Sequence, residues 1–125
     1  MKTTEALDHA IAAHAKWKYR LMEVINTGRS EWHVSDVRSD NACEFGKWLA
    51  ALSLSERLSE HCRTVRALHT QFHSLAADVL ELALAGRKEE ATAAMALQSR
   101  FASVSSGLTM AVIAWKEAAS SDRSQ

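Results

Sequence analysis

Residues 53–86, SLSERLSEHCRTVRALHTQFHSLAADVLELALAG, decide the fold class of this chain. Ser53 followed three residues later by Glu56 fits a capping box, so a long helix is predicted to begin there. It is predicted to run to about Ala85 and to stop at Gly86, which suits the left-handed position after a helix. Its seam recurs in alternating steps of three and four residues, as in a helical bundle. The seam consists of Cys62, Val65, His69, Phe72, Ala76, Val79 and Ala83.

Two further long helices are predicted on either side of this segment. The first begins near Thr4 and ends at Gly28, and the last runs from about Lys88 to Ala119. Both show a stripe with helical spacing. The stripe of the first is Leu7, Ala10, His14, Trp17, Leu21 and Val24, and that of the last is Leu97, Phe101, Val104, Leu108, Ala111 and Trp115.

A short helix is predicted from Asn41 to about Leu52, with Asp40 as its N-cap and Cys43 in its first turn. The helix dipole at that end favours a thiolate. The stretch between Gly28 and Asp40 is a connection with room for a short helical turn. Proline is absent and there are only four glycines, so few residues interrupt the helices. The predicted fold is all-α, a four-helix bundle with an additional short helix that carries Cys43.

Composition bounds the class of protein. The 125 residues predict a single domain, residues 1–119, followed by a flexible tail, residues 120–125. Lysine plus arginine equals aspartate plus glutamate at fifteen each, which disfavours nucleic acid and anionic membranes as partners. No signal peptide or membrane-spanning segment is found in the sequence, so we expect a cytoplasmic location. Two cysteines are too few for a disulfide framework.

Histidines stand on the predicted seams where a bundle ordinarily places leucine. His14 lies on the first helix, and His69 and His73 lie one turn apart on the third, so their imidazoles can converge on one ion. A histidine that faces a core needs a polar partner, because an unpaired ring nitrogen costs several kcal/mol. Together with Cys43 they supply three nitrogens and one sulfur, a donor set suited to tetrahedral zinc.

Simpler explanations stay open for these residues. The histidines can be hydrogen-bonded within the core or solvated, and a cysteine such as Cys43 is often a small buried apolar residue. Cys62 is explained by packing on the seam, although a disulfide with Cys43 is an alternative. The remaining histidines fall off the proposed ligand faces and are predicted to be solvated; they are His9, His33 and His61.

Three segments resemble the chemoreceptor zinc-binding (CZB) domain family: HAKWKYRL from His14, CEFGKWL from Cys43, and HTQFH from His69. The resemblance implies one zinc ion held by His14, Cys43, His69 and His73. It also implies a homodimer that senses zinc or oxidants such as hypochlorous acid. Members are usually joined to chemoreceptors or diguanylate cyclases, so the output, in cis or in trans, is expected to be chemotaxis or cyclic-di-GMP signalling.

Four protein ligands would close the coordination sphere, so no catalytic activity is expected. Cys43 is the one ligand that can be oxidised reversibly, which makes it the expected trigger of a switch. Two alternatives stay open. The zinc can be purely structural, or the bundle can be a DinB-like thiol transferase in which three histidines hold the metal and Cys43 is spare.

Overall fold

The computed structural model describes residues 2–123, and within this range the chain forms seven helices and no strand. The all-α prediction is confirmed. The helices are α1 (Thr3–Thr27), α2 (Val34–Arg38), α3 (Glu44–Ala50), α4 (Leu54–Arg57), α5 (Glu60–Leu84), α6 (Lys88–Ala94) and α7 (Arg100–Arg123). None of these helices combines the length and the apolar character that crossing a bilayer would require.

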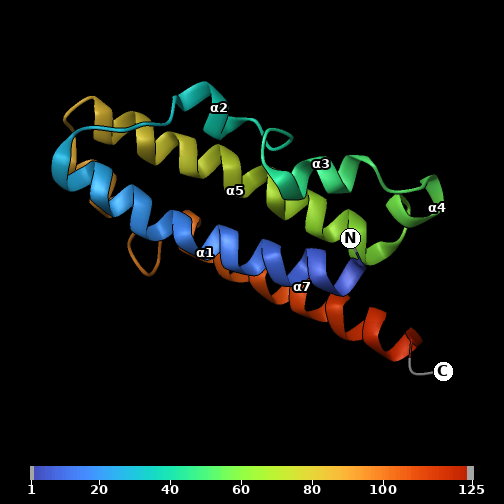
Figure 1. Cartoon of the computed structure of the whole chain (residues 1–125). Coiled ribbons are helices and arrows are strands. Elements are labelled where there is room, and N and C mark those ends of the chain that lie inside the picture. The colour runs from blue at the N-terminus through green and yellow to red at the C-terminus, as the bar shows by residue number, and fades with distance from the viewer. Residues whose placement is uncertain (1, 124–125) are drawn as a thin grey trace.

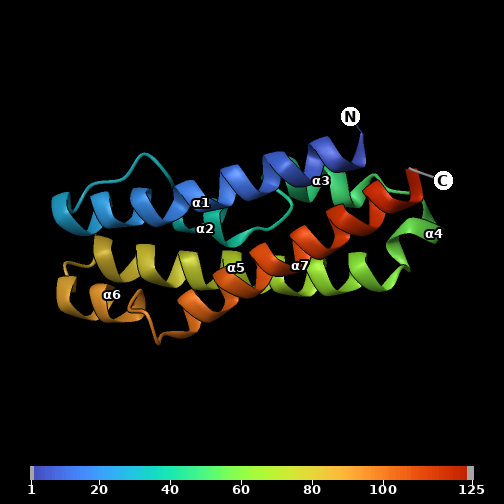
Figure 2. The same cartoon turned by 90° about the horizontal axis from the view of Figure 1, so that it is seen from below.

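Three long helices set the shape of the molecule (Figure 1). α1 and α5 run in the same direction, and α7 runs opposite to both (Figure 2). The return from α1 to α5 is made by the segment that contains α2, α3 and α4, which lies along α5 on the side away from α7. α5 is the central helix, because α1, α2, α4, α6 and α7 all pack against it. Residues on α5 therefore face both the long helices and the returning segment.

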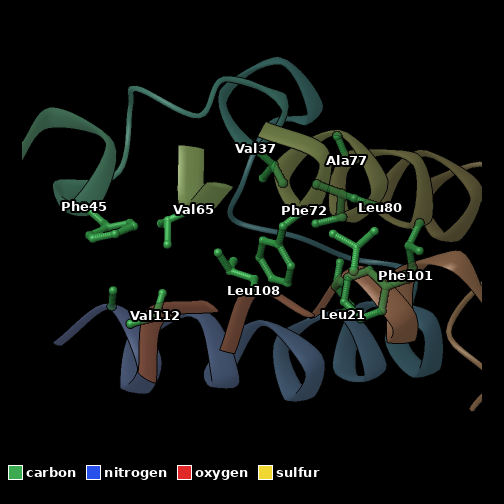
Figure 3. Packing of buried hydrophobic residues seen from close by; sticks show 14 of the residues in the cluster. Leu21, Val37, Phe45, Val65, Phe72, Ala77, Leu80, Phe101, Leu108 and Val112 are labelled. Atoms are coloured by element: carbon green, nitrogen blue, oxygen red, sulfur yellow. The ribbon is translucent and has the colours of Figure 1, made fainter. Parts of the chain in front are cut away.

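The core fills the space between α5 and the pair formed by α1 and α7 (Figure 3). Every seam residue predicted for the third helix is buried. Phe72 is 1% exposed and its ring lies 5.5 Å from that of Phe101 on α7. Burying a phenylalanine side chain stabilises the fold by about 1.5–3 kcal/mol. The Phe72 ring also lies 5.8 Å from that of His73 and 5.2 Å from that of His14, so the core and the predicted metal site are continuous.

Two predicted helices are each divided in the structure. The capping box of Ser53 and Glu56 is present, but the helix that it opens is only four residues long. Ser59 then caps α5 by accepting a hydrogen bond from the backbone N–H of Cys62 at 3.2 Å. Leu54 and Leu58 are 65% and 60% exposed, so no core contact favours a continuous helix there.

The last predicted helix, Lys88 to Ala119, is interrupted between α6 and α7. Leu97, predicted on its apolar stripe, is 93% exposed in this interruption. The hydroxyl of Ser99 accepts a hydrogen bond from the N–H of Ala102 at 3.2 Å, which starts a new helix. α7 then continues to Arg123, past the predicted end at Ala119. Residues 124 and 125 of the predicted tail lie outside the described residues.

Candidate metal centre

The fold brings the four predicted site residues together from three helices. His14 comes from the middle of α1, His69 and His73 from α5, and Cys43 from the start of α3. One nitrogen from each histidine and the sulfur of Cys43 all lie within 4.8 Å of one another. His69 and His73 are buried, at 1% and 3% exposure, whereas His14 and Cys43 are half-buried.

The spacing of the donor atoms fits a tetrahedral zinc ion. The Nε2 atom of His69 lies 3.1 Å from that of His14 and 3.0 Å from that of His73. The sulfur of Cys43 lies 3.4 Å from the Nε2 of His69 and 3.6 Å from that of His73. Ordinary zinc bond lengths in a tetrahedron place two nitrogens about 3.3 Å apart, and a nitrogen and a sulfur about 3.5 Å apart. These four separations therefore match a tetrahedral ion, and all four donor atoms lie within 4.8 Å of one another.

Backbone carbonyls fix the tautomers of two histidines. Nδ1 of His14 lies 2.7 Å from the carbonyl oxygen of Ala10, and Nδ1 of His73 lies 2.9 Å from that of Val37. A carbonyl can only accept, so each Nδ1 carries the proton and donates it. The Nε2 atoms of His14 and His73 are then unprotonated, and each lies close to Nε2 of His69. His69 carries at most one proton on this nitrogen, so it can donate to only one of the two. A cation at the centre satisfies all three nitrogens, and this arrangement is typical of metal-bound histidine.

Burial keeps these imidazoles neutral. It lowers the pKa of His14 to about 4, against the opposing hydrogen bond to Ala10. Burial, together with the neighbouring His73 and His14, lowers the pKa of His69 to about 3. The pKa of His73 is lowered for the same main reason, desolvation. Near pH 7 all three rings are thus available as ligands without first losing a proton.

Cys43 is itself the N-cap of α3, which corrects the prediction that Asp40 caps a helix beginning at Asn41. Its sulfur accepts a hydrogen bond from the backbone N–H of Gly46 at 3.3 Å. The sulfhydryl lies 3.6 Å from the carbonyl oxygen of Asp40. The predicted bias toward a thiolate is outweighed, because burial raises the pKa of Cys43 against the lowering effect of the Gly46 and Phe45 backbone N–H groups. A bound metal reverses this balance, since a coordinating thiol loses its proton.

Gly46 allows a close backbone contact beside Cys43. A Cβ atom built on Gly46 would lie 1.8 Å from the carbonyl oxygen of Asp40, far inside any real contact. The missing side chain lets the backbone of the loop approach the first turn of α3. The carboxylate of Asp40 accepts a hydrogen bond from the hydroxyl of Thr70, which ties the same loop to α5. Cys43 is therefore positioned from both sides, by its own helix and by the preceding loop.

The aromatic rings of Phe45 and Phe72 border the cluster. The Phe45 ring lies 5.9 Å from His14 and 5.2 Å from His69, and the Phe72 ring lies 5.2 Å from His14. These low-polarity neighbours strengthen the attraction between a cation and its ligands. His14 and Cys43 also line a groove between α1 and α3, so the thiol is reachable from the surface.

The other candidate residues behave as their sequence positions predicted. The three histidines assigned to solvent, His9, His33 and His61, are exposed. Cys62 is fully buried among apolar side chains, and neither it nor Cys43 takes part in a disulfide. The sequence did not reveal the carbonyl partners at Ala10 and Val37, because backbone acceptors leave no mark in residue identity. The glycine of CEFG was the one available signal for the close loop contact.

Comparison with known families decides the classification. The model of the family described as chemoreceptor zinc-binding domain, CZB, matches residues 14–80, which is over half of the chain and contains all four site residues. The chain belongs to the CZB family. No curated protein and no solved structure matches it significantly. In this CZB domain the matched region begins at His14 and includes α2, α3, α4 and most of α5.

Proposed function

We propose that this CZB domain binds one Zn²⁺ ion through His14, Cys43, His69 and His73 and serves as a non-catalytic regulatory module. The observation that carries the proposal is the convergence of three Nε2 atoms and one sulfur at separations that suit a tetrahedral ion. Bound zinc would stabilise the thiolate and tie three helices into one arrangement. Four protein ligands leave no open position for a substrate.

The arrangement of helices supports a bundle as the framework of this module. We infer a four-helix bundle in which α1, α5 and α7 supply three members and the returning segment with α2 and α3 takes the fourth place. The alternating directions of these four segments support this architecture (Figure 2). Because the ligands come from α1, α3 and α5, zinc binding then depends on the relative position of three of the four members.

We propose further that Cys43 is the point at which an oxidant acts. Its sulfur borders an open groove, whereas His69 and His73 are almost fully covered. The thiolate would attack the chlorine of hypochlorous acid and release hydroxide. Water would then convert the sulfenyl chloride to a sulfenic acid, with loss of chloride and a proton. An oxidised sulfur is a poorer zinc ligand than a thiolate, so the ion and the start of α3 would be released together.

The proposed setting is bacterial signalling in the cytoplasm. A homodimer that acts on a chemoreceptor or a diguanylate cyclase, in cis or in trans, is supported by membership of a family named for chemoreceptors. The balanced charge supports a protein partner over nucleic acid or a membrane surface.

Elemental analysis of protein purified without added zinc tests the proposal. We expect about one zinc per chain, retained on dialysis and removed by a strong chelator. Hypochlorous acid should release the ion from the wild-type protein and change its affinity for the chemoreceptor or diguanylate cyclase partner. Protein free of zinc after purification, or oxidation with no change in partner affinity, would contradict the binding and the sensing proposals respectively.

A purely structural zinc site is the main competing function. Affinity separates the two, because a sensor has to exchange its ion at cellular free zinc concentrations whereas a structural ion stays bound. A DinB-like thiol transferase is a second alternative, and it requires Cys43 to be unbound. The 3.4 Å separation between the Cys43 sulfur and Nε2 of His69 favours ligation by sulfur instead.

A further inference from the structure

A groove of about 510 Å³ lies between α1 and α3, beside the metal cluster. Its α1 wall combines three small residues with His9, His14, Trp17 and Arg20, and the aromatic rings of Phe45 and Trp48 belong to its α3 wall. The small residues are Ala6, Ala10 and Ala13. Pockets for small organic molecules typically measure about 300–1,000 Å³ and combine apolar walls with a few polar groups. The size and lining of this groove meet that description.

One cation is held in place at this groove. The guanidinium of Arg20 lies 5.1 Å from the ring centroids of both Trp17 and Trp32, and these rings are 5.3 Å apart. Stacking on ring faces leaves the N–H edge of a guanidinium free to bind a carboxylate in bidentate fashion. In the part of the chain that the structure describes, no carboxylate pairs with Arg20. Arg20 thus contacts two indole rings and has no paired carboxylate among the described residues.

We propose that the groove binds a small organic monocarboxylate with a planar apolar body. The carboxylate pairs with Arg20, and the apolar body lies between the alanines of α1 and the rings of α3. Glu44 also lines the groove, and its negative charge disfavours a second anionic group on the ligand. The groove recognises its ligand through Arg20 and apolar side chains and not through the four proposed metal ligands, although His14 and Cys43 form part of its lining.

Occupancy of the groove has a consequence for Cys43, and this consequence rests on the proposed zinc-sensing function. The open approach to the sulfur is through the groove, so a bound molecule covers the thiol and slows its reaction with oxidants. The carboxylate would then act as a modulator of the sensor.

Titration of the zinc-loaded full chain with phenylacetate, followed by two-dimensional NMR, tests the proposal. Saturable shifts are expected at the amides of Ala10 and Ala13 and at the indole N–H of Trp48. Phenylacetamide, which has the same shape without the charge, should bind about 10-fold more weakly or worse, because a hydrogen bond to a charged group is worth about 1.5–3 kcal/mol. Equal binding of the two compounds, or no saturable shift, would overturn the proposal.

Matched variants assign the binding to the groove. Arg20→Gln should weaken phenylacetate binding about 10-fold or more, whereas Lys16→Gln, an exposed cation on the same helix, should leave it unchanged. Ala13→Leu fills the groove from an exposed position and should abolish binding while thermal stability is kept. Thermal melting of each variant identifies any loss of folding. If Ala13→Leu folds and still binds as the wild type does, the groove is not the site.

Zinc content measured on the same samples separates this proposal from the preceding one. Zinc present without phenylacetate binding overturns only the groove site. Phenylacetate binding without zinc overturns only the metal proposal. In the zinc-loaded wild type, phenylacetate should also slow the reaction of Cys43 with a colorimetric disulfide reagent, and an unchanged rate would overturn the shielding of the thiol.

Discussion

At the scale of single residues, the four residues of the candidate metal centre differ in their chemistry. His69 and His73 are buried and inert toward oxidants, whereas Cys43 is half-buried, polarisable and open to a groove. His14 and His69 were readable from the sequence because histidine is rare on a bundle seam, and His73 because it follows His69 by one turn. Cys43 was proposed to complete a donor set suited to zinc. The orientation of His14 and His73 was not readable, since it is set by the carbonyls of Ala10 and Val37.

Replacing the sulfur ligand should weaken zinc binding selectively. Loss of an outer-sphere partner typically costs about 10–100-fold in metal affinity, so Cys43→Ala, which removes a direct ligand, should cost more than about 100-fold. Competition titration against a zinc chelator measures the affinity. The exposed His33→Gln variant is the control and should bind as the wild type does. A Cys43→Ala protein with wild-type affinity would remove sulfur from the coordination sphere.

Gly46 offers a sharp steric test. Gly46→Ala places a methyl group against the carbonyl oxygen of Asp40, so the loop or α3 has to move and the Cys43 sulfur moves with it. We expect a loss of about 1–3 kcal/mol in stability together with weaker zinc binding. Gly107→Ala is the matched control. Its new Cβ would meet Leu68 at an ordinary 3.7 Å, and a helical glycine replaced by alanine should gain about 0.5–1 kcal/mol. Chemical denaturation measures the free energy of unfolding of both variants. A result in which both are more stable than wild type, or both less stable, would contradict this account.

The stability of the zinc-free protein should fall as the pH is lowered below about 6.5. In that range the unfolded chain binds protons on its histidines, while the folded chain keeps His14 neutral down to about pH 4 and His69 down to about pH 3. Because the unfolded state binds more protons, acid favours unfolding. Thermal melting of chelator-treated protein between pH 7 and pH 4.5 measures the trend. His69→Leu, which binds no proton at this position, should flatten the curve, and an unchanged slope would argue against a buried neutral His69.

At the scale of helices, the sequence predicted which segments are helical better than where they end. The seam from Cys62 to Ala83 was readable because every member is buried against a neighbour. The helix breaks near Ser59 and Ser99 could not be read from the sequence, because the leucine and alanine residues beside them favour helix. Only the tertiary structure shows that Leu58 and Leu97 are exposed to solvent and have no core contact. The N-cap role of Cys43 was missed for a related reason: Asp40 is a better cap by residue type, but its carboxylate is engaged by Thr70.

Two serine caps allow the contribution of these breaks to be measured. Ser59 caps the 25-residue helix that carries His69 and His73, whereas Ser53 caps a helix of four exposed or half-exposed residues. Ser59→Ala should cost about 1 kcal/mol of unfolding free energy, and Ser53→Ala should cost clearly less. Urea denaturation measures both. Equal losses would mean that the short helix contributes to the fold as much as the start of α5 does.

At the scale of the whole molecule, the central helix α5 also supplies two of the four residues of the candidate metal centre. Zinc binding as proposed would therefore be coupled to packing of the returning segment against α5, because Cys43 and Val37 both lie on that segment and contact His69 and His73 respectively. The sequence predicted one domain and four convergent ligands. It also predicted the short helix that carries Cys43, but not that the Val37 carbonyl of α2 would accept a hydrogen bond from His73.

Dimerisation is the expected assembly state of this CZB domain. Light scattering coupled to size exclusion should give about twice the 13.8 kDa mass of the chain. Zinc removal or oxidation of Cys43 should change the elution volume or the dimer affinity. A mass of one chain at concentrations well above micromolar would contradict the expected homodimer.

The absorption spectrum of the cobalt-substituted protein tests the central claim most directly. Cobalt(II) takes the place of zinc in tetrahedral sites and, unlike zinc, reports its ligands by colour. We predict one cobalt per chain, the strong visible bands of a tetrahedral ion and an intense sulfur-to-cobalt charge-transfer band that disappears in Cys43→Ala. Weak bands of an octahedral ion, or a wild-type spectrum without the charge-transfer band, would contradict a site built from three imidazoles and the Cys43 thiolate.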